Sequence, residues 1–435
     1  MTNRFINKTK TMTASSTSQW FSPAPSALTA KRLSLDFGLR SADLYFRDQV
    51  VPGIGNVWFV RQLSWPLAAL QLNKTLGISR LRPAEICYGI EALACKLEFM
   101  HGDSKSTRIL GRRAFGRDND GDPWAFSQLR KVTNYVRNTH RQTAMRAIRS
   151  TQGLCFAQGT RFDQFELEPI GQDLAQEFLD QRVGQGRGTL GSWLREWIEN
   201  RNTVPSQPTT LLVALSPESA TKKECEIVRS RLLGVKSPEC ETRKFLAQAL
   251  EVDADLPDIE KTVVKRLRQA GRAAQADMVL AARAFGAMLD RARDAVASLT
   301  RAVEPERGDV KLTKLGSDSA IQKSIKKLQD ASKNYIDKAN TAAVKEATSR
   351  SFADAVAAGD DEGVIRFLAG RSGEVLGFAD DSVTRGSLFR IVNGTDEASD
   401  LEDGASSIEP DRAGRTFRIA NFHALLHDTK QGGAR

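Results

Sequence analysis

Six side chains between residues 137 and 149 are of the types that contact nucleic acid. They are Arg137, His140, Arg141, Gln142, Arg146 and Arg149. Arginine donates hydrogen bonds to phosphate oxygens and to guanine, and glutamine pairs with the edge of adenine. Met145 and Ile148 lie among the arginines at helical spacing, which predicts one amphipathic helix. The chemistry expected of this helix is recognition of a phosphate backbone and of base edges.

The chain around this helix is strongly basic. Residues 104–150 hold eleven cations against three acids, an excess of eight. The cations are Lys105, Arg108, Arg112, Arg113, Arg117, Arg130, Lys131, Arg137, Arg141, Arg146 and Arg149. The protein has a formal net charge of +10 and a pI near 9.4, and such a balance favours anionic partners, nucleic acid first and a membrane surface second. Arg112, Arg113 and Arg161 are further residues that we expect to hold a phosphate backbone.

Local signals place the basic helix within a series of short elements. Helical spacing of apolar residues, proline at first turns and glycine at breaks define the elements. They are, in order, a helix from Pro83, a helix from Asp122 with Val132 on its apolar face, the basic helix capped by Asn138 or Thr139, a β-hairpin at 154–157 and 162–167, and a helix after Gly171. The sequence therefore predicts helices followed by a hairpin and one more helix.

This order resembles the winged helix family, in which a helix enters the major groove and a hairpin wing follows the phosphate backbone. The stretch FELEPIGQDLAQEFL is similar to the end of such a domain, a wing strand followed by Leu-Thr-x-x-Gly and a helix rich in alanine and leucine. The matching residues are Leu167, Gly171, Leu174 and Ala175, whereas Glu168 stands where the family often has threonine or serine. The resemblance implies a DNA-binding module over residues 83–180. Winged helices that bind proteins instead remain an alternative, because the wing tip carries only Arg161.

A second, shorter resemblance covers residues 36–65. Asp48, Val51, Pro52, Gly53, Arg61 and Trp65 occur in the order seen in uncharacterised bacterial proteins encoded near phage-defence and mobile-element genes. The resemblance implies a cytosolic bacterial protein of a multi-protein antiphage system. The chain departs from that pattern by having a single arginine in place of a denser basic run. An ordinary helical hairpin with aromatic core residues is the alternative.

Motifs for catalysis or cofactor binding are incomplete in this sequence. His423 and His427 lie one helical turn apart, but the glutamate of the zinc-protease motif is missing. Glu224 follows Lys222 and Lys223, which is the wrong order for a restriction-type nuclease. The run DNDGD at 118–122 lacks the glutamate that closes a calcium loop, since Leu129 stands there. We therefore predict a non-catalytic protein with no cofactor and no metal site.

Length and composition predict a mainly α protein of several parts. The 435 residues are 40% apolar, enough for two or three domains. We expect a disordered tail at 1–30, with Met12 an alternative start, a helical and winged helix domain at 31–182, a helical domain at 209–358, and an acidic, small α+β region at 359–435. The five cysteines form no C-x-x-C pair, which predicts reduced thiols in a cytoplasmic protein. No apolar run is long enough to predict a membrane span.

Two further features concern the helical part and the choice of function. Lys261, Lys265, Arg268 and Arg272 form one stripe on a helix, which we interpret as a solvated face. The expected partners are nucleic acid, with double-stranded DNA favoured, and other protein subunits. A protein-interaction scaffold is the first alternative. An enzyme with dispersed residues, among them Glu85 or Asp163, is the second.

Overall fold

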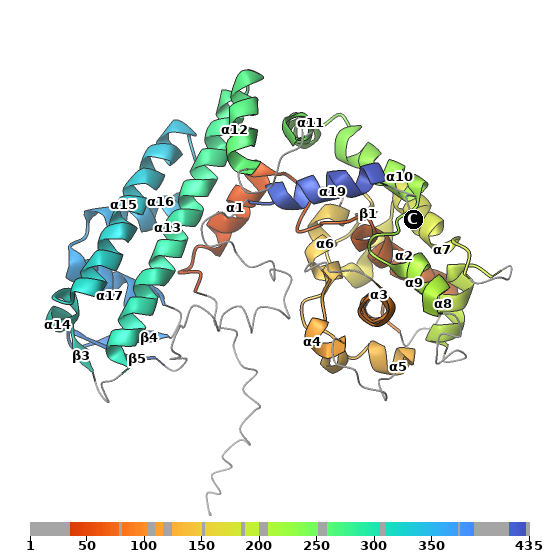
Figure 1. Cartoon of the computed structure of the whole chain (residues 1–435), viewed down its shortest axis with the longest axis horizontal. Helices are drawn as coiled ribbons and strands as arrows, with labels where there is room; N and C mark the ends of the chain where they lie inside the picture. Colours follow the sequence, from red (N-terminus) through yellow and green to blue (C-terminus); the bar gives the residue numbers. More distant parts are fainter. Residues whose placement is uncertain are drawn as a thin grey trace, which may run out of the picture. The chain divides into compact units, whose positions relative to one another are not determined.

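The computed structural model describes residues 35–77, 81–102, 109–115, 124–149, 153–183, 188–199, 208–250, 259–304, 309–372, 375–386 and 417–431. These residues are mainly helical and include two small antiparallel sheets (Figure 1). The predicted fold class, mainly α with a small hairpin, is therefore confirmed. The predicted tail at 1–30 lies outside the described residues.

The elements of the first half surround the basic helix. They are α1 (Arg40–Val50), α2 (Arg61–Leu76), α3 (Pro83–His101), α4 (Arg112–Phe115), α5 (Phe126–Leu129), the 3-10 turn η1 (Val132–Asn134), α6 (His140–Ile148), β1 (Ala157–Gln158), the 3-10 turn η2 (Phe162–Gln164), β2 (Glu166–Leu167), α7 (Pro169–Leu179), α8 (Leu190–Ile198) and α9 (Pro208–Leu215).

The elements of the second half are longer. They are α10 (Lys222–Leu233), α11 (Pro238–Leu250), α12 (Ile259–Gln269), α13 (Ala273–Val303), β3 (Val310–Lys311), α14 (Leu312–Gly316), α15 (Ser319–Thr341), α16 (Ala347–Ala358), α17 (Asp361–Arg371), β4 (Leu376–Ala379), β5 (Ser382–Arg385) and α19 (Ile419–Gln431).

Among the elements of the first half, helix α2 is central and packs against α3, α6 and α7. It begins at Arg61 and contains Pro66. Its buried residues lie on all sides, with Trp65 fully covered. Helix α3 begins at Pro83 as predicted and buries Cys87 and Cys95. Both thiols therefore lie in the core.

The hairpin that follows α6 is present, with shorter strands than predicted. β1 and β2 pair antiparallel, with Ala157 opposite Leu167. Residues 162–164 fold into the turn η2 instead of continuing the strand. The following helix α7 begins at Pro169, and a Cβ atom on Gly171 would come within 2.0 Å of the Phe156 carbonyl oxygen. Only glycine therefore allows this close approach of helix and strand.

The helix predicted from Asp122 differs from the structure. Residues 121–123 lie outside the described residues, and the helical part is limited to α5 and the turn η1. Val132 is 54% exposed, so it does not belong to an apolar face. The cap of α6 is Thr139, one of the two predicted residues. Its hydroxyl accepts from Gln142 N at 3.3 Å, and Gln142 Oε1 accepts from Thr139 N at 3.1 Å, which is a capping box.

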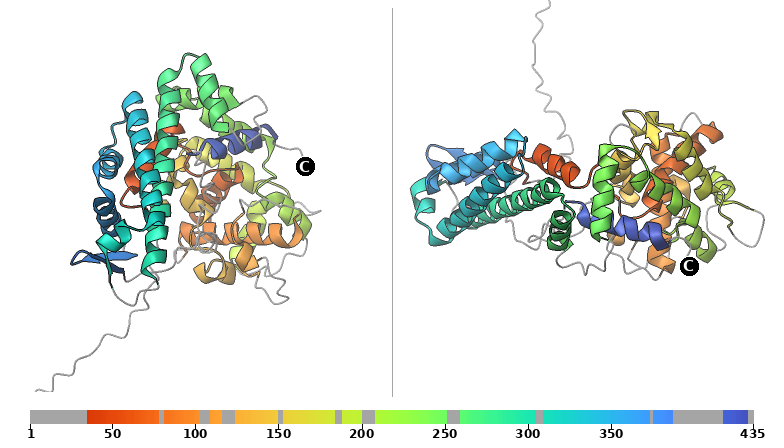
Figure 2. Two further views of the ribbon diagram at one scale, coloured as in Figure 1. Left: turned by 60° about the vertical axis from the view of Figure 1, so that its left-hand side comes forward. Right: turned by 90° about the horizontal axis from the view of Figure 1, so that it is seen from above.

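Helices α13, α15 and α16 form the second group, in which α13 runs beside α15 (Figure 2). Helix α1 packs against α13 and α16, and the rings of Phe46 and Phe285 stack at 4.9 Å. Between α15 and α16 the chain turns at Ala343, whose φ is +50°. Glu346 then caps α16 by accepting from the N–H groups of Thr348 and Ser349.

The C-terminal elements pack against earlier ones. β5 pairs with β3 as well as with β4, and α19 lies against α10, α11 and α12. These contacts cross the boundary predicted at 358, and packing of α3 on α9 crosses the boundary predicted near 209. The domain boundaries themselves stay a prediction.

Candidate nucleic-acid interface

One face of α6 packs on α2 and α3, and the opposite face is open. The buried face consists of His140, Ala144, Ala147 and Ile148, spaced as one side of a helix. The open face carries the predicted residues Arg141, Gln142 and Arg149, which are half-buried or exposed. The amphipathic character expected of this segment is therefore present.

Three predicted arginines near α6 have no acidic partner among the described residues. Arg137, just before the helix, and Arg161, in the hairpin loop, are exposed. Arg149, at the helix end, is half-buried, and its Nε lacks an acceptor. Within the described part of the chain, no hydrogen bond or ion pair occupies these guanidinium groups. Such groups are available to an anion.

Arg141 connects α6 to its two neighbours. Its guanidinium lies 4.9 Å from the ring centre of Phe162 in η2, a cation–π contact. Its backbone N donates to Glu91 Oε1 of α3 at 2.6 Å. The hairpin turn and α3 therefore both fix the start of α6, and the cation remains at the edge of the open face.

Arg146 differs from the expectation, because an internal carboxylate pairs with it. Asp48 at the end of α1 forms an ion pair with Arg146, and it also accepts from Arg418 Nη1 at 2.8 Å. Arg418 precedes α19, and burial lowers its pKa to about 10. One carboxylate thus joins the basic helix to the C-terminal helix, and Arg146 is already partly neutralised.

His140 also differs from the expectation. Its side chain is only 3% exposed and lies edge-on to the rings of Phe59 and Trp65 at 5.2 and 5.7 Å. Burial lowers the pKa of His140 to about 3, so the imidazole is neutral and faces the core. Gln142 is exposed, but its amide oxygen belongs to the capping box with Thr139.

The three arginines predicted to hold a phosphate backbone lie in different surroundings. Arg112 is exposed on α4, 5.9 Å from the ring of Phe99, and the side chain of Arg113 lies outside the described residues. The hairpin carries Arg161 beside acidic residues. They are Asp163, Glu166 and Glu168. The hairpin is therefore net acidic and does not form a basic wing.

Glu91 on α3 was not among the residues predicted from the sequence, although it accepts a hydrogen bond from the first turn of α6. Burial raises the pKa of Glu91 to about 7, although the nearby Arg141 cation and N–H group act in the opposite direction. Glu91 Oε1 accepts from Arg141 N and from the thiol of Cys87, whereas Oε2 is buried without a hydrogen bond. The available signal was an acid within an apolar helix, because such acids are seldom buried without a local role.

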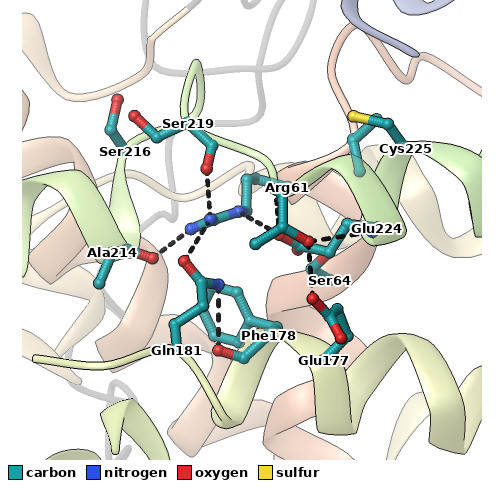
Figure 3. A network of polar contacts seen from close by, with 12 residues as sticks. Arg61, Ser64, Glu177, Phe178, Gln181, Ala214, Ser216, Ser219, Glu224 and Cys225 are labelled. Carbon is teal, nitrogen blue, oxygen red and sulfur yellow. Dashed lines mark hydrogen bonds and ion pairs between the residues drawn. The ribbon is translucent and has the colours of Figure 1, made fainter. Parts of the chain in front are cut away.

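A second polar cluster surrounds Arg61 and is drawn in Figure 3. Arg61 Nε donates to Glu224 Oε2 at 3.1 Å, and both side chains are fully buried. The other guanidinium nitrogens donate to the carbonyl oxygens of Ala214 and Ser219 and to Gln181 Oε1. Protein oxygens already occupy these nitrogens, so the cluster joins α2 to α9 and α10.

The structure also locates the remaining chemical candidates. His423 and His427 both lie on α19, one turn apart as predicted. Among the described residues, no three His, Cys, Asp or Glu side chains gather where a metal ion could be held. Within the same residues, no helix combines the length and apolar composition that crossing a bilayer requires.

Comparison of the chain with protein-family models, with curated proteins and with solved structures gave no match. The winged helix resemblance and the resemblance to phage-defence-associated proteins therefore stay predictions.

Proposed function

We propose that this protein binds duplex nucleic acid, DNA first, through the open face of α6, and that it does so without catalysis. The observation that supports the proposal best is the set of arginines without acidic partners around this helix, Arg137, Arg149 and Arg161. A half-buried guanidinium has lost part of its hydration, so a phosphate oxygen that accepts from it completes its hydrogen bonding.

The order of α3, α6, the hairpin and α7 agrees with a winged helix arrangement, which we retain as part of the proposal. The hairpin is short and net acidic, so we assign the phosphate contacts to α6 and its flanks. Membership of a multi-protein bacterial defence system rests on the resemblance of residues 36–65 alone. The scaffold alternative predicts that a partner protein, and not a duplex, covers the same face.

The test is the salt dependence of binding to a short duplex of random sequence. Each neutralised phosphate contributes about 0.9 to the slope of log K against log salt. The double variant Arg137→Gln, Arg149→Gln should therefore bind more weakly and lower that slope by about two. Fluorescence anisotropy across a range of salt concentrations measures both quantities.

The matched control removes two exposed arginines from other helices. Arg195 on α8 and Arg301 on α13 are exposed, and their double change to glutamine alters the net charge equally. Its slope should stay that of the unmodified protein. Equal losses in both double variants would mean that only total charge matters. Absence of binding by the unmodified protein would favour the scaffold alternative.

A further inference from the structure

The basic stripe predicted on α12 lines a groove between α12 and α13. The groove has a volume of about 460 Å³. Its cationic lining consists of Lys261, Lys265, Arg268 and Arg283. Arg272, the last residue of the predicted stripe, instead lies 3.6 Å from the ring centre of Phe245. Three residues of the stripe are exposed, as a solvated face requires, and they also line one side of this groove.

The groove lining contains four cations and one carboxylate, and some of these cations already have a carboxylate partner. Arg283 pairs with Glu260 at 3.6 Å, and Arg268 pairs with Asp277 at 3.2 Å. Lys265 is exposed and has no ion pair within the described residues. Lys265 is therefore a groove cation without a carboxylate partner among the described residues, which favours an anionic occupant.

The lining of the groove distinguishes between kinds of anion. Val264 and Leu280 contribute apolar surface to the groove, and its lining includes no aromatic residue. Single-stranded nucleic acid is usually held by aromatic stacking of the bases as well as by cations. An acidic peptide with aliphatic side chains uses both the cations and the apolar surface. The groove therefore fits an acidic peptide better than a single-stranded nucleic acid.

We propose that residues 395–411 of the same chain occupy this groove. The stretch TDEASDLEDGASSIEPD contains seven acids and no lysine or arginine. It also contains two aliphatic residues, Leu401 and Ile408. Its charge and its apolar residues complement the groove, and this inference does not depend on the proposed binding of nucleic acid by α6.

The place where the described chain resumes makes this docking possible. Residues 387–416 lie outside the described residues, and the next residue, Phe417, has its ring 6.3 Å from the ring of Phe285 on α13. Leu280 of the groove is five residues earlier on α13, a rise of about 7.5 Å. The six residues from Asp411 to Phe417 can span about 20 Å. A tether of this length gives the stretch an effective concentration of about a millimolar.

Carbodiimide cross-linking of the full chain, followed by mass spectrometry, tests this docking, because the reagent joins only lysines and carboxylates in contact. We expect links from Lys261 and Lys265 to residues 396–411. Lys323 and Lys327, exposed on α15, are the internal control and should give few such links. Similar yields from both pairs of lysines would overturn the proposal.

Two substitutions separate docking from attraction between opposite charges. The variant Leu401→Ser, Ile408→Ser keeps every lysine and acid, and its links to Lys261 and Lys265 should fall about tenfold if the aliphatic groups are held. The matched control is Leu388→Ser, Ile391→Ser, which lies before the acidic stretch and should leave the yield unchanged. Equal yields in the two variants would refute docking in the groove.

A mixture of isotope-labelled and unlabelled chains identifies the source of the acidic stretch. We expect each cross-linked pair of peptides to carry a single isotope composition, because both come from one chain. Pairs of mixed composition would show that a second copy supplies the stretch, and that result would overturn the intramolecular proposal.

Discussion

Replacing Glu224 with glutamine should destabilise the protein strongly, because it removes the charge that balances a buried arginine. Glu224 accepts from Arg61 Nε at 3.1 Å, from Thr221 N at 2.8 Å and from the Ser64 hydroxyl at 2.6 Å. Both members of the ion pair have side chains with 0% exposure. The Glu224→Gln variant therefore tests whether this pair holds α2 against α10.

The expected size follows from what glutamine retains. Its carbonyl oxygen can still accept from Arg61 and Thr221, and its amide can donate to the Ser64 hydroxyl if that hydroxyl rotates. The hydrogen bonds therefore survive in number, but the Arg61 charge is left in the interior with neutral partners. Removing one member of a buried ion pair costs about 3–5 kcal/mol, and retained hydrogen bonds place the loss near 3 kcal/mol.

Urea unfolding followed by circular dichroism measures this loss as a change in the free energy of unfolding. The matched control is Glu226→Gln on the same helix. Glu226 pairs with Lys222 at 3.9 Å, and their side chains are 64% and 82% exposed. Such an exposed pair contributes little, so the control should change the free energy by less than about 0.5 kcal/mol. Similar small losses in both variants would refute the structural role assigned to the buried pair.

Three further predictions concern α6 and the hairpin. Thr139→Ala removes the cap of α6 and should lower the free energy of unfolding by about 1 kcal/mol in urea titrations. Gly171→Ala places a methyl group against the Phe156 carbonyl oxygen and should cost about 1–3 kcal/mol, whereas Gly370→Ala, with open space around it, should not lower the melting temperature. The pKa of Glu91 is raised to about 7 from its ordinary 4.5, so the folded state holds its proton more tightly. Stability should therefore fall as pH rises from about 4.5 to about 7, by up to about 3 kcal/mol, and Glu91→Gln should remove this dependence.

The features that sequence predicted correctly depend on neighbouring residues. Pro83 begins α3 and Thr139 caps α6. Each is a local signal, because a first helical turn or a cap acts within a few positions of itself. Helical spacing also places His140 on the buried face with Ala144, because the two residues lie four positions apart.

The features that sequence did not predict depend on contacts between distant segments. Arg146 and Asp48 are far apart in the chain, and Arg418 is farther still. Periodicity identifies which face of α6 carries cations, but it cannot identify which cation an internal carboxylate already neutralises. The sequence shows Arg61 and Glu224 only as single residues, and the fold of the chain brings their side chains together as an ion pair.

The pairing of Arg146 with Asp48 limits how strongly α6 can bind nucleic acid. Arg137, Arg149 and Arg161 keep no acidic partner within the described residues, and the guanidinium of Arg141 forms no ion pair there, although Glu91 lies near it. Four phosphates neutralised by four arginines give a salt slope of at most about 3.6, and contacts of this kind correspond to dissociation constants of about 10⁻⁴–10⁻⁶ M at physiological salt. The unmodified protein should therefore bind a random duplex weakly and with a slope below about four. A steeper slope in the anisotropy series would mean that a surface other than α6 neutralises phosphates, and the assignment to α6 would then be wrong.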